Sequence, residues 1–257
     1  MNGNKVVYNR RNVAESWYSE SLQQPETFLF IKYGSEISGK SVLDIGVGAG
    51  RTSFFLHRVS AGYVGCDFAE SMIDVCRTRF PTTRFEVVDA REMSLFDDNS
   101  FDTVIFSFNG LDCINHEGRI QALSEIRRVL RHNGLFIFSF HNRAYSGFVG
   151  RPPLNFCLNP IRMARRMAGW WLIDLPNHRK SRQLAVVHDD YELRNDSSHR
   201  WQMVHYYINR RSQEVQLGRF GFTVLDFVDW NGRCLTADSD DSHSGTIYVA
   251  SRCSKDQ

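Results

Sequence analysis

The stretch that most constrains the fold of this chain is "LDIGVGAGR", residues 43–51. It places Gly46, Gly48 and Gly50 directly after a short apolar run and before "RTSFFLHRV", which predicts a helix. Bare glycines let a ligand approach the backbone, and they leave N–H groups available where a helix begins. The segment therefore predicts a ligand site at the carboxyl end of a strand in a doubly wound sheet.

Strands and helices alternate from residue 41 to about residue 142. Apolar runs predict strands at 41–46, 63–67, 84–89, 101–108 and 134–140. The intervening segments 69–80 and 117–130 carry apolar residues at helical spacing, and Pro81 and Asn133-Gly134 end them. This alternation indicates an α/β fold with a parallel sheet and right-handed crossovers.

The alternation stops after the fifth strand. Residues 143–200 contain four of the six prolines and no clear strand pattern. Regular patterns return with "WQMVHYYIN" at 201–209, a helix over 210–220, and two late strands at 222–229 and 245–252. We therefore predict a single domain over 1–257, with an N-terminal helical segment at 1–40 and an insertion at 143–200.

Composition narrows the class of protein. The chain has 31 Lys and Arg residues against 29 Asp and Glu, a balance that argues against a dedicated nucleic-acid binder. The six cysteines form no CxxC pair, so no metal site is expected. The first twenty residues lack the apolar core of a signal peptide, and no run of eighteen apolar residues occurs. These features predict a cytoplasmic protein without a transmembrane segment.

The glycine spacing and a nearby carboxylate indicate which ligand the loop binds. A dinucleotide fold favours G-x-G-x-x-G, whereas here the third glycine comes one residue early and Arg51 follows it. Asp44, two residues before the first glycine, would repel a phosphate. The same carboxylate would favour an ammonium group, directly or through water. The loop is thus expected to bind the amino-acid end of a ligand.

Two further acids follow the next two strands. Asp67 ends the second strand, where a carboxylate can accept hydrogen bonds from both ribose hydroxyls. Asp89 ends the third strand, where it can accept from the exocyclic amine of adenine, and Ala90 leaves room for the ring. An adenosine with an amino-acid tail is S-adenosylmethionine, whose demethylated product is S-adenosylhomocysteine.

Residues 41–142 resemble a class I S-adenosylmethionine-dependent methyltransferase of the small-molecule subgroup. The similar segments are "VLDIGVGAG", "VGCDFAESMI", "VVDAREM", "FDTVIFSFNGLDCI" and "EIRRVLRHNGLFIFS", with His132-Asn133 in place of the common Pro-Gly. The resemblance implies a Rossmann-like, doubly wound, seven-stranded sheet of order 3-2-1-4-5-7-6 with strand 7 antiparallel. It also implies further cofactor-binding residues: Arg51, Phe68, Met72, Ala90, Arg91, Phe108 and Asn109.

Methyl transfer requires an acceptor held near the sulfonium methyl group, and a hydroxyl acceptor also requires a base. Residues at the ends of strands four and five are candidates, and a histidine suits proton removal near neutral pH. The catalytic candidates are His141, His116 and Asp112. His141 could instead be a structural residue, and His116 could cap the following helix.

Further residues are assigned to the acceptor by likeness to small-molecule methyltransferases. The substrate candidates are Asn142, Asp196, His199, Tyr206 and Tyr207. Either tyrosine could instead be a core aromatic residue. The acceptor itself is left open as a sugar, a glycan precursor or a natural product, methylated on oxygen or nitrogen.

The insertion is strongly basic. Residues 143–182 contain eight Lys and Arg residues against Asp174 alone, a net charge of +7. Such a run can be a solvated surface, or it can attract an anionic substrate, a carrier or an anionic membrane surface. We expect the insertion to act as a substrate cap, with Arg165 and Arg166 near an anionic small molecule.

Two other functions are compatible with parts of the pattern. A nicotinamide-dependent oxidoreductase would share the sheet, but the early third glycine, Asp44 and the final hairpin argue against it. A non-catalytic module that binds S-adenosylmethionine would share the whole cofactor site. Nucleic-acid methylation is disfavoured because "SFNG" stands after the fourth strand where an N-P-P-Y-type tetrad is expected.

Overall fold

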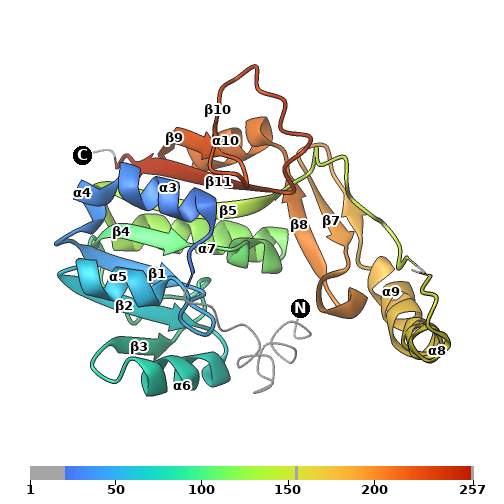
Figure 1. Ribbon diagram of the computed structural model, residues 1–257. Helices are drawn as coiled ribbons and strands as arrows, with labels where there is room; N and C mark the ends of the chain where they lie inside the picture. Colours follow the sequence, from blue (N-terminus) through green and yellow to red (C-terminus); the bar gives the residue numbers. More distant parts are fainter. Residues whose placement is uncertain (1–20, 154–155, 256–257) are drawn as a thin grey trace.

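A computed structural model describes residues 21–153 and 156–255. A twisted sheet runs through the molecule, with helices on both of its faces (Figure 1). Its parallel strands are β1 (Ser41–Ile45), β2 (Gly62–Asp67), β3 (Arg84–Val87), β4 (Phe101–Phe106) and β5 (Leu130–Asn142). The strands β9 (Phe222–Val228), β10 (Cys234–Leu235) and β11 (Thr246–Cys253) follow late in the chain.

The main path of the sheet has the order β10-β9-β11-β5-β4-β1-β2-β3. Strand β11 lies between β5 and β9 and is antiparallel to both. Without the two-residue strand β10, this is the order 3-2-1-4-5-7-6 with an antiparallel seventh strand. The predicted fold class is therefore confirmed.

Side chains alternate between the two faces of the sheet and form two cores. Along β4, Val104 and Phe106 join one core, whereas Ile105 joins the other. The first core is covered by α7 (His116–Val129) and α10 (Arg210–Arg219). The second is covered by α3 (Gln24–Lys32), α4 (Gly34–Ile37), α5 (Ser53–Val59) and α6 (Glu70–Arg79). Residues buried on both faces explain why the central strands are almost wholly apolar.

The N-terminal helical segment expected over 1–40 is represented by α3 and α4. Residues 1–20 of that prediction lie outside the described residues.

The predicted insertion contains more regular structure than the sequence indicated. It contributes α8 (Pro160–Gly169), the π-helix η2 (Trp170–Asp174), α9 (Leu175–Arg182), β6 (Val186–Val187) and β7 (Tyr191–Asn195). The short 3₁₀ helix η3 (Ser198–Trp201) leads into β8 (Val204–Ile208), which pairs with β7.

Strands β7 and β8 are attached to the rest of the sheet through β5. Its partner β4 reaches only Phe138, whereas β5 continues to Asn142. Beyond the part of β5 that β4 reaches, β8 pairs with its end, with His141 opposite Tyr207 and Asn142 opposite Ile208. The insertion is thus joined to the fold at the carboxyl end of β5, and α8 and α9 project beyond that edge (Figure 1).

Candidate functional site

A cavity of about 310 Å³ opens at the carboxyl ends of β1, β2, β3 and β4. Pockets that hold small ligands are commonly of this size or larger. The predicted cofactor residues that line it are Gly46, Gly48, Arg51, Asp67, Phe68, Met72, Asp89, Ala90, Arg91 and Phe108. The described structure thus brings these residues together, although they come from four different strand ends. Asp44, Gly50 and Asn109 are not among the lining residues.

Each of the three positions in the loop requires glycine for a different structural reason. All three have positive φ angles, of 66° at Gly46, 53° at Gly48 and 86° at Gly50. A Cβ atom at Gly46 would lie 2.8 Å from the Phe106 ring, and one at Gly50 would lie 2.7 Å from the Phe80 ring. At Gly48 nothing lies within 4 Å of that position. Gly48 therefore leaves the space open through which a ligand can approach the backbone.

Asp67, the last residue of β2, holds the glycine loop that follows β1 in place. Its carboxylate accepts hydrogen bonds from the backbone N–H of Gly48, at 3.0 Å, and of Ala69, at 2.9 Å. Burial raises the pKa of Asp67 to about 6, and the backbone hydrogen bonds limit that rise. The side chain is 7% exposed yet lines the cavity, so its remaining lone pairs are available to a ligand.

Asp89 lies at the end of the cavity formed by β3. Both of its carboxylate oxygens accept from the guanidinium of Arg91, at 2.9 and 2.6 Å. The two side chains are partly exposed, at 38% and 43%. The ion pair holds the Asp89 carboxylate in one orientation, beside the small side chain of Ala90.

Asp44 is buried behind the residues that line the cavity. It is 1% exposed, and its Oδ2 accepts from the hydroxyls of Thr52, at 2.7 Å, and Tyr63, at 2.8 Å. Burial raises the pKa of Asp44 to about 7. Thr52 itself lines the cavity. Of the two routes predicted from the sequence, direct contact or contact through water, the burial of Asp44 disfavours the direct one, and an effect on a ligand ammonium group would pass through Thr52 or through water.

A buried carboxylate that sequence reasoning missed stands behind Arg51. Glu26 of α3 is 0% exposed, forms a bidentate ion pair with Arg51, and accepts from the hydroxyls of Ser107 and Tyr248. Arg51 and Ser107 both line the cavity. No local pattern could have found Glu26, because its partner Ser107 lies 81 residues away.

The loop after β4 has an unusual backbone. Phe108 and Asn109 are consecutive non-glycine residues with positive φ, of 56° and 59°. Such residues occur where surrounding contacts enforce them, and they are concentrated at functional sites. The Asn109 amide donates to Thr246 Oγ1 at 3.0 Å, and the Phe108 ring lies under the Arg51 guanidinium. The strained turn thereby presents Phe108 to the cavity.

His141 and Asp112 meet near the carboxyl end of β5. Asp112 Oδ2 accepts from the backbone N–H of His141 at 2.6 Å. The ring nitrogen Nδ1 of His141 lies 2.9 Å from the same oxygen, but in a direction that makes no aligned hydrogen bond. Asp112 Oδ1 accepts from Arg119 at 2.6 Å, and both of these side chains are fully buried. Asp112 is therefore placed to position His141 rather than to touch a substrate.

A second polar cluster adjoins His141. The imidazole of His205 lies 2.8 Å from Asp196 Oδ2, which also accepts from the Tyr207 hydroxyl at 2.9 Å. The ring of His141 lies 4.9 Å from that of Tyr207 and 5.3 Å from that of His205. Asp196 and Tyr207, both predicted substrate residues, are thus brought beside the predicted base.

His205 and Cys113 are further site residues that the sequence analysis missed. Burial alone would lower the pKa of His205, but hydrogen bonds with Asp196 and Cys113 raise it to about 10. Cys113 also lines the cavity. It therefore links the cavity to the cluster around His141. The alternating strand pattern of 204–208 was the only available signal, since it places His205 and Tyr207 on one face.

Other predicted residues occupy structural positions. Tyr206 is fully buried, and its hydroxyl contacts His116 Nδ1 at 3.0 Å. His116 begins α7 and stacks on Tyr191, and neither His116 nor Tyr206 is among the residues that line the cavity. The Asn142 amide donates to the carbonyls of Asp241 and Ser244, which holds the loop before β11.

The remaining predicted substrate residues lie in the insertion. His199 belongs to η3, and its side chain lies outside the described residues. Arg165 and Arg166 are exposed on α8, and neither is among the residues that line the cavity.

The described residues contain no group of three or more His, Cys, Asp or Glu side chains that could hold a metal ion. Among the same residues, no helix has both the length and the apolar character that a membrane crossing requires.

Sequence comparison relates the cavity-forming part of the chain to known proteins. Residues 42–134 match the family described as a methyltransferase domain. A demethylmenaquinone methyltransferase of Clavibacter sepedonicus is 32% identical over 133 residues, which are 51% of this chain and 52% of that protein. One from Beutenbergia cavernae is 36% identical over 99 residues, 38% of this chain and 40% of that protein. The chain thus spans about half, or less, of the length of these relatives.

Solved structures share the fold over nearly the whole chain. The 1,6-didemethyltoxoflavin-N1-methyltransferase of Burkholderia thailandensis, solved with S-adenosylhomocysteine, superposes with a TM-score of 0.60 at 14% identity. The superposed region covers 98% of this chain and 87% of the Burkholderia thailandensis chain. The CcbJ methyltransferase of Streptomyces caelestis gives a TM-score of 0.63 at 15% identity, over 95% and 96% of the two chains. Residues 42–134 are therefore similar to a methyltransferase domain, and the chain shares the fold of these two solved methyltransferases.

Proposed function

We propose that this protein transfers the methyl group of S-adenosylmethionine to a small-molecule acceptor. The observation that carries the proposal is the cavity, which gathers the glycine loop, Asp67 and Asp89 at adjacent strand ends and reaches Cys113 beside the His141 cluster. Asp67 would accept from the ribose hydroxyls, and Asp89 from the adenine amine. Arg51, Thr52 and Ser107 would face the amino-acid end.

The bound cofactor supplies an electrophilic methyl group on a sulfonium centre. The residues of this chain have to hold the acceptor in line with that methyl group and keep water away from it. We place the acceptor between Cys113 and His141. For an oxygen acceptor, the His141 imidazole would take the hydroxyl proton. Asp112 positions His141 through its backbone N–H.

The class of acceptor is proposed from the cluster and from the similar proteins. The relatives are named for demethylmenaquinone, and one neighbour holds 1,6-didemethyltoxoflavin. In this chain the acceptor side presents the rings of Tyr207 and Phe148, whose centroids lie 5.6 Å apart, with Arg194 against both. The aromatic rings favour a flat acceptor, whereas the Arg194 guanidinium is already paired with Glu192.

A transfer assay tests the proposal. The protein is incubated with S-adenosylmethionine labelled in its methyl group and with an extract of small molecules. Label is expected to move into an organic product, with release of S-adenosylhomocysteine. The matched control is Asp67→Ala. Label that stays in the cofactor, in a protein that binds S-adenosylhomocysteine, would support a non-catalytic binding module instead.

The affinity for the cofactor should depend on pH through Asp67. The ionised carboxylate accepts from ribose hydroxyls better than the protonated acid does, so binding favours the ionised form. Since the pKa of Asp67 is raised to about 6, affinity should be level above about pH 7 and fall as the pH falls through 6. Because a single group titrates, the affinity can fall by at most about tenfold per pH unit.

Calorimetric titration of S-adenosylhomocysteine between pH 5 and pH 8 measures this dependence. The Asp67→Asn variant keeps the shape of the side chain but cannot titrate, so its profile should be flat. An unchanged slope in that variant would assign the dependence to another group, of which Asp44 is the nearest candidate.

A further inference from the structure

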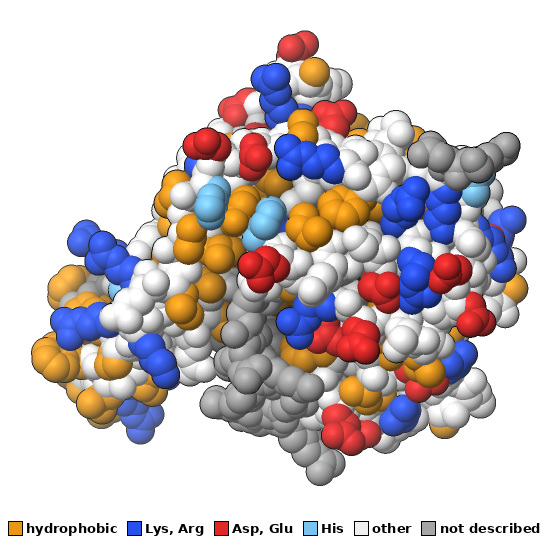
Figure 2. All heavy atoms as spheres, turned by 180° about the vertical axis from the view of Figure 1, so that it is seen from behind, with side chains coloured by type: hydrophobic (Ala, Val, Ile, Leu, Met, Phe, Trp, Pro, Cys, Tyr) orange, Lys and Arg blue, Asp and Glu red, His pale blue; other side chains and the backbone are white. Residues whose placement is uncertain are grey.

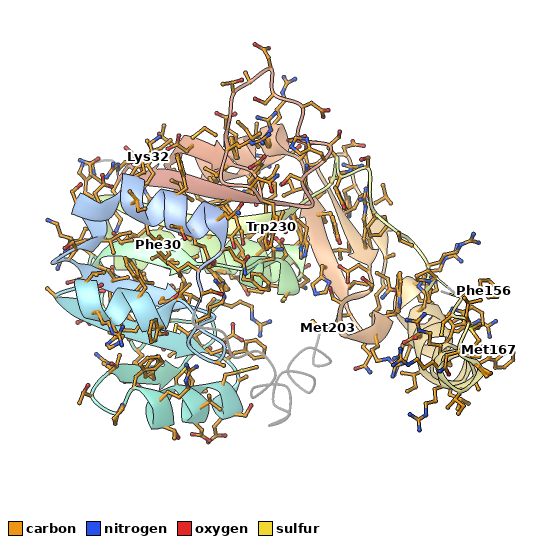
Figure 3. All side chains as sticks on the ribbon, viewed as in Figure 1. Phe30, Lys32, Phe156, Met167, Met203 and Trp230 are labelled. Carbon is orange, nitrogen blue, oxygen red and sulfur yellow. The ribbon has the colours of Figure 1, made fainter. Side chains whose placement is uncertain are left out.

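Residues 156–182, here called the helical tip, expose large apolar side chains. The tip comprises α8, η2 and α9, which follow one another without a break, and no residue of α8 is buried. Ile161 is 67% exposed, Trp171 66% and Leu172 74%. Phe156, just before α8, is 83% exposed. Figure 3 shows Phe156 and Met167 at the outer end of the molecule, away from the sheet.

These exposed residues share one face of the helix. At 100° per residue, Ile161, Ala164 and Ala168 of α8 fall within one arc. Trp171 and Leu172 continue this arc about one turn later, in the π-helix η2. The side of the helix that contacts the rest of the protein is a different one, since Trp170 donates to the Pro152 carbonyl and Asp174 pairs with Arg200. The apolar arc is therefore not the side by which the helix packs against the rest of the protein.

Basic side chains flank the apolar arc. Arg162, Arg165 and Arg166 occupy the neighbouring arc of α8. Three further exposed cations, Arg179, Lys180 and Arg182, follow in α9. The only acid of the tip, Asp174, is paired with Arg200 at 2.9 Å. Figure 2 shows the result as a lobe on which orange apolar side chains and blue cations lie side by side.

An apolar face bordered by cations, with tryptophan at its edge, matches a helix that lies in the plane of a membrane interface. The apolar side chains enter the boundary of the acyl chains, and long arginine side chains reach the headgroups. A second copy of the chain fits less well, since a symmetric contact through this face would bring the cations of one copy against those of the other.

We propose that the helical tip docks this protein onto the surface of an anionic lipid bilayer. The tip does not span the bilayer but lies on it. It is joined through β7 and β8 to the carboxyl end of β5. Docking would therefore hold the edge of the sheet that carries His141 toward the membrane.

Vesicle sedimentation tests the proposal with the full chain. The two vesicle types are phosphatidylcholine alone, and phosphatidylcholine with phosphatidylglycerol in equal amounts. We expect binding to the anionic vesicles that weakens as salt rises, and at least tenfold weaker binding to the neutral ones. Trp171→Glu with Leu172→Glu, and separately Arg165→Glu with Arg166→Glu, should each reduce binding at least tenfold. Val215→Glu, at an exposed apolar position on α10, should change nothing.

The variants should remain folded, since every substituted side chain is exposed, and circular dichroism checks this. Affinity for S-adenosylhomocysteine should be unchanged in all of them, so failure of membrane docking and failure of the proposed function are distinguishable. No binding of the wild-type protein to anionic vesicles would overturn the proposal. So would a wild-type dimer that Trp171→Glu with Leu172→Glu converts to a monomer.

Discussion

Replacing His141 with alanine should lower the rate of methyl transfer to an oxygen acceptor by roughly 10²–10⁴ fold. The imidazole is 18% exposed beside Tyr207 and His205, and Asp112 fixes the backbone from which it projects. Without it, the acceptor proton has no positioned base. Single-turnover transfer from labelled cofactor measures the chemical step, and calorimetry should show unchanged affinity for S-adenosylhomocysteine.

His116→Ala is the matched control for this prediction. His116 contacts the Tyr206 hydroxyl at 3.0 Å and stacks on Tyr191, so its loss should affect packing and leave the chemical step nearly unchanged. Asp112→Asn should keep transfer detectable but slow it, because His141 would be less well positioned. If His141→Ala retains a rate within a few-fold of the wild type, His141 is not the base.

Replacing Asp67 with alanine should weaken binding of S-adenosylhomocysteine by about 2–4 kcal/mol, or roughly 30- to 700-fold. The substitution removes the acceptor for two hydroxyls. It also removes the acceptor for the Gly48 and Ala69 N–H groups, which hold the loop. Calorimetric titration at pH 7.5 measures the change.

Asp89→Ala provides the comparison for Asp67. Asp89 is partly exposed and already paired with Arg91, so its loss should cost less binding energy than the loss of buried Asp67. Equal losses in the two variants would contradict the assignment of Asp67 to the ribose. Full affinity in Asp67→Ala would remove the basis for the whole site.

The fold and the position of the cavity could be predicted because their signals are local. A strand buried on both faces is a continuous apolar run, and an acid directly after it must lie at the carboxyl edge of the sheet. Gly48, Asp67 and Asp89 are each read from a few neighbouring residues. Parallel strands then bring these separate segments together without further information.

The acceptor side could not be predicted in the same way, because its contacts join distant segments. Behind His141 and Asp112, Arg119 reaches Gln216 across 97 residues. The same holds for one part of the cofactor side, where Glu26 reaches Ser107 across 81 residues. β8 can pair with β5 because β4 ends before β5 does. The sequence of β5 alone does not show where β4 ends. The cations of α8 follow β5 closely in the chain, but Arg165 and Arg166 are not among the residues that line the cavity.

The most direct test of the central claim is calorimetric titration of the full chain with S-adenosylhomocysteine, beside matched titrations with NAD(H) and NADP(H). We expect one binding site per chain for S-adenosylhomocysteine, lost or strongly weakened in Asp67→Ala, and no binding of either nicotinamide cofactor. Binding of a nicotinamide cofactor in the absence of any heat from S-adenosylhomocysteine would contradict it.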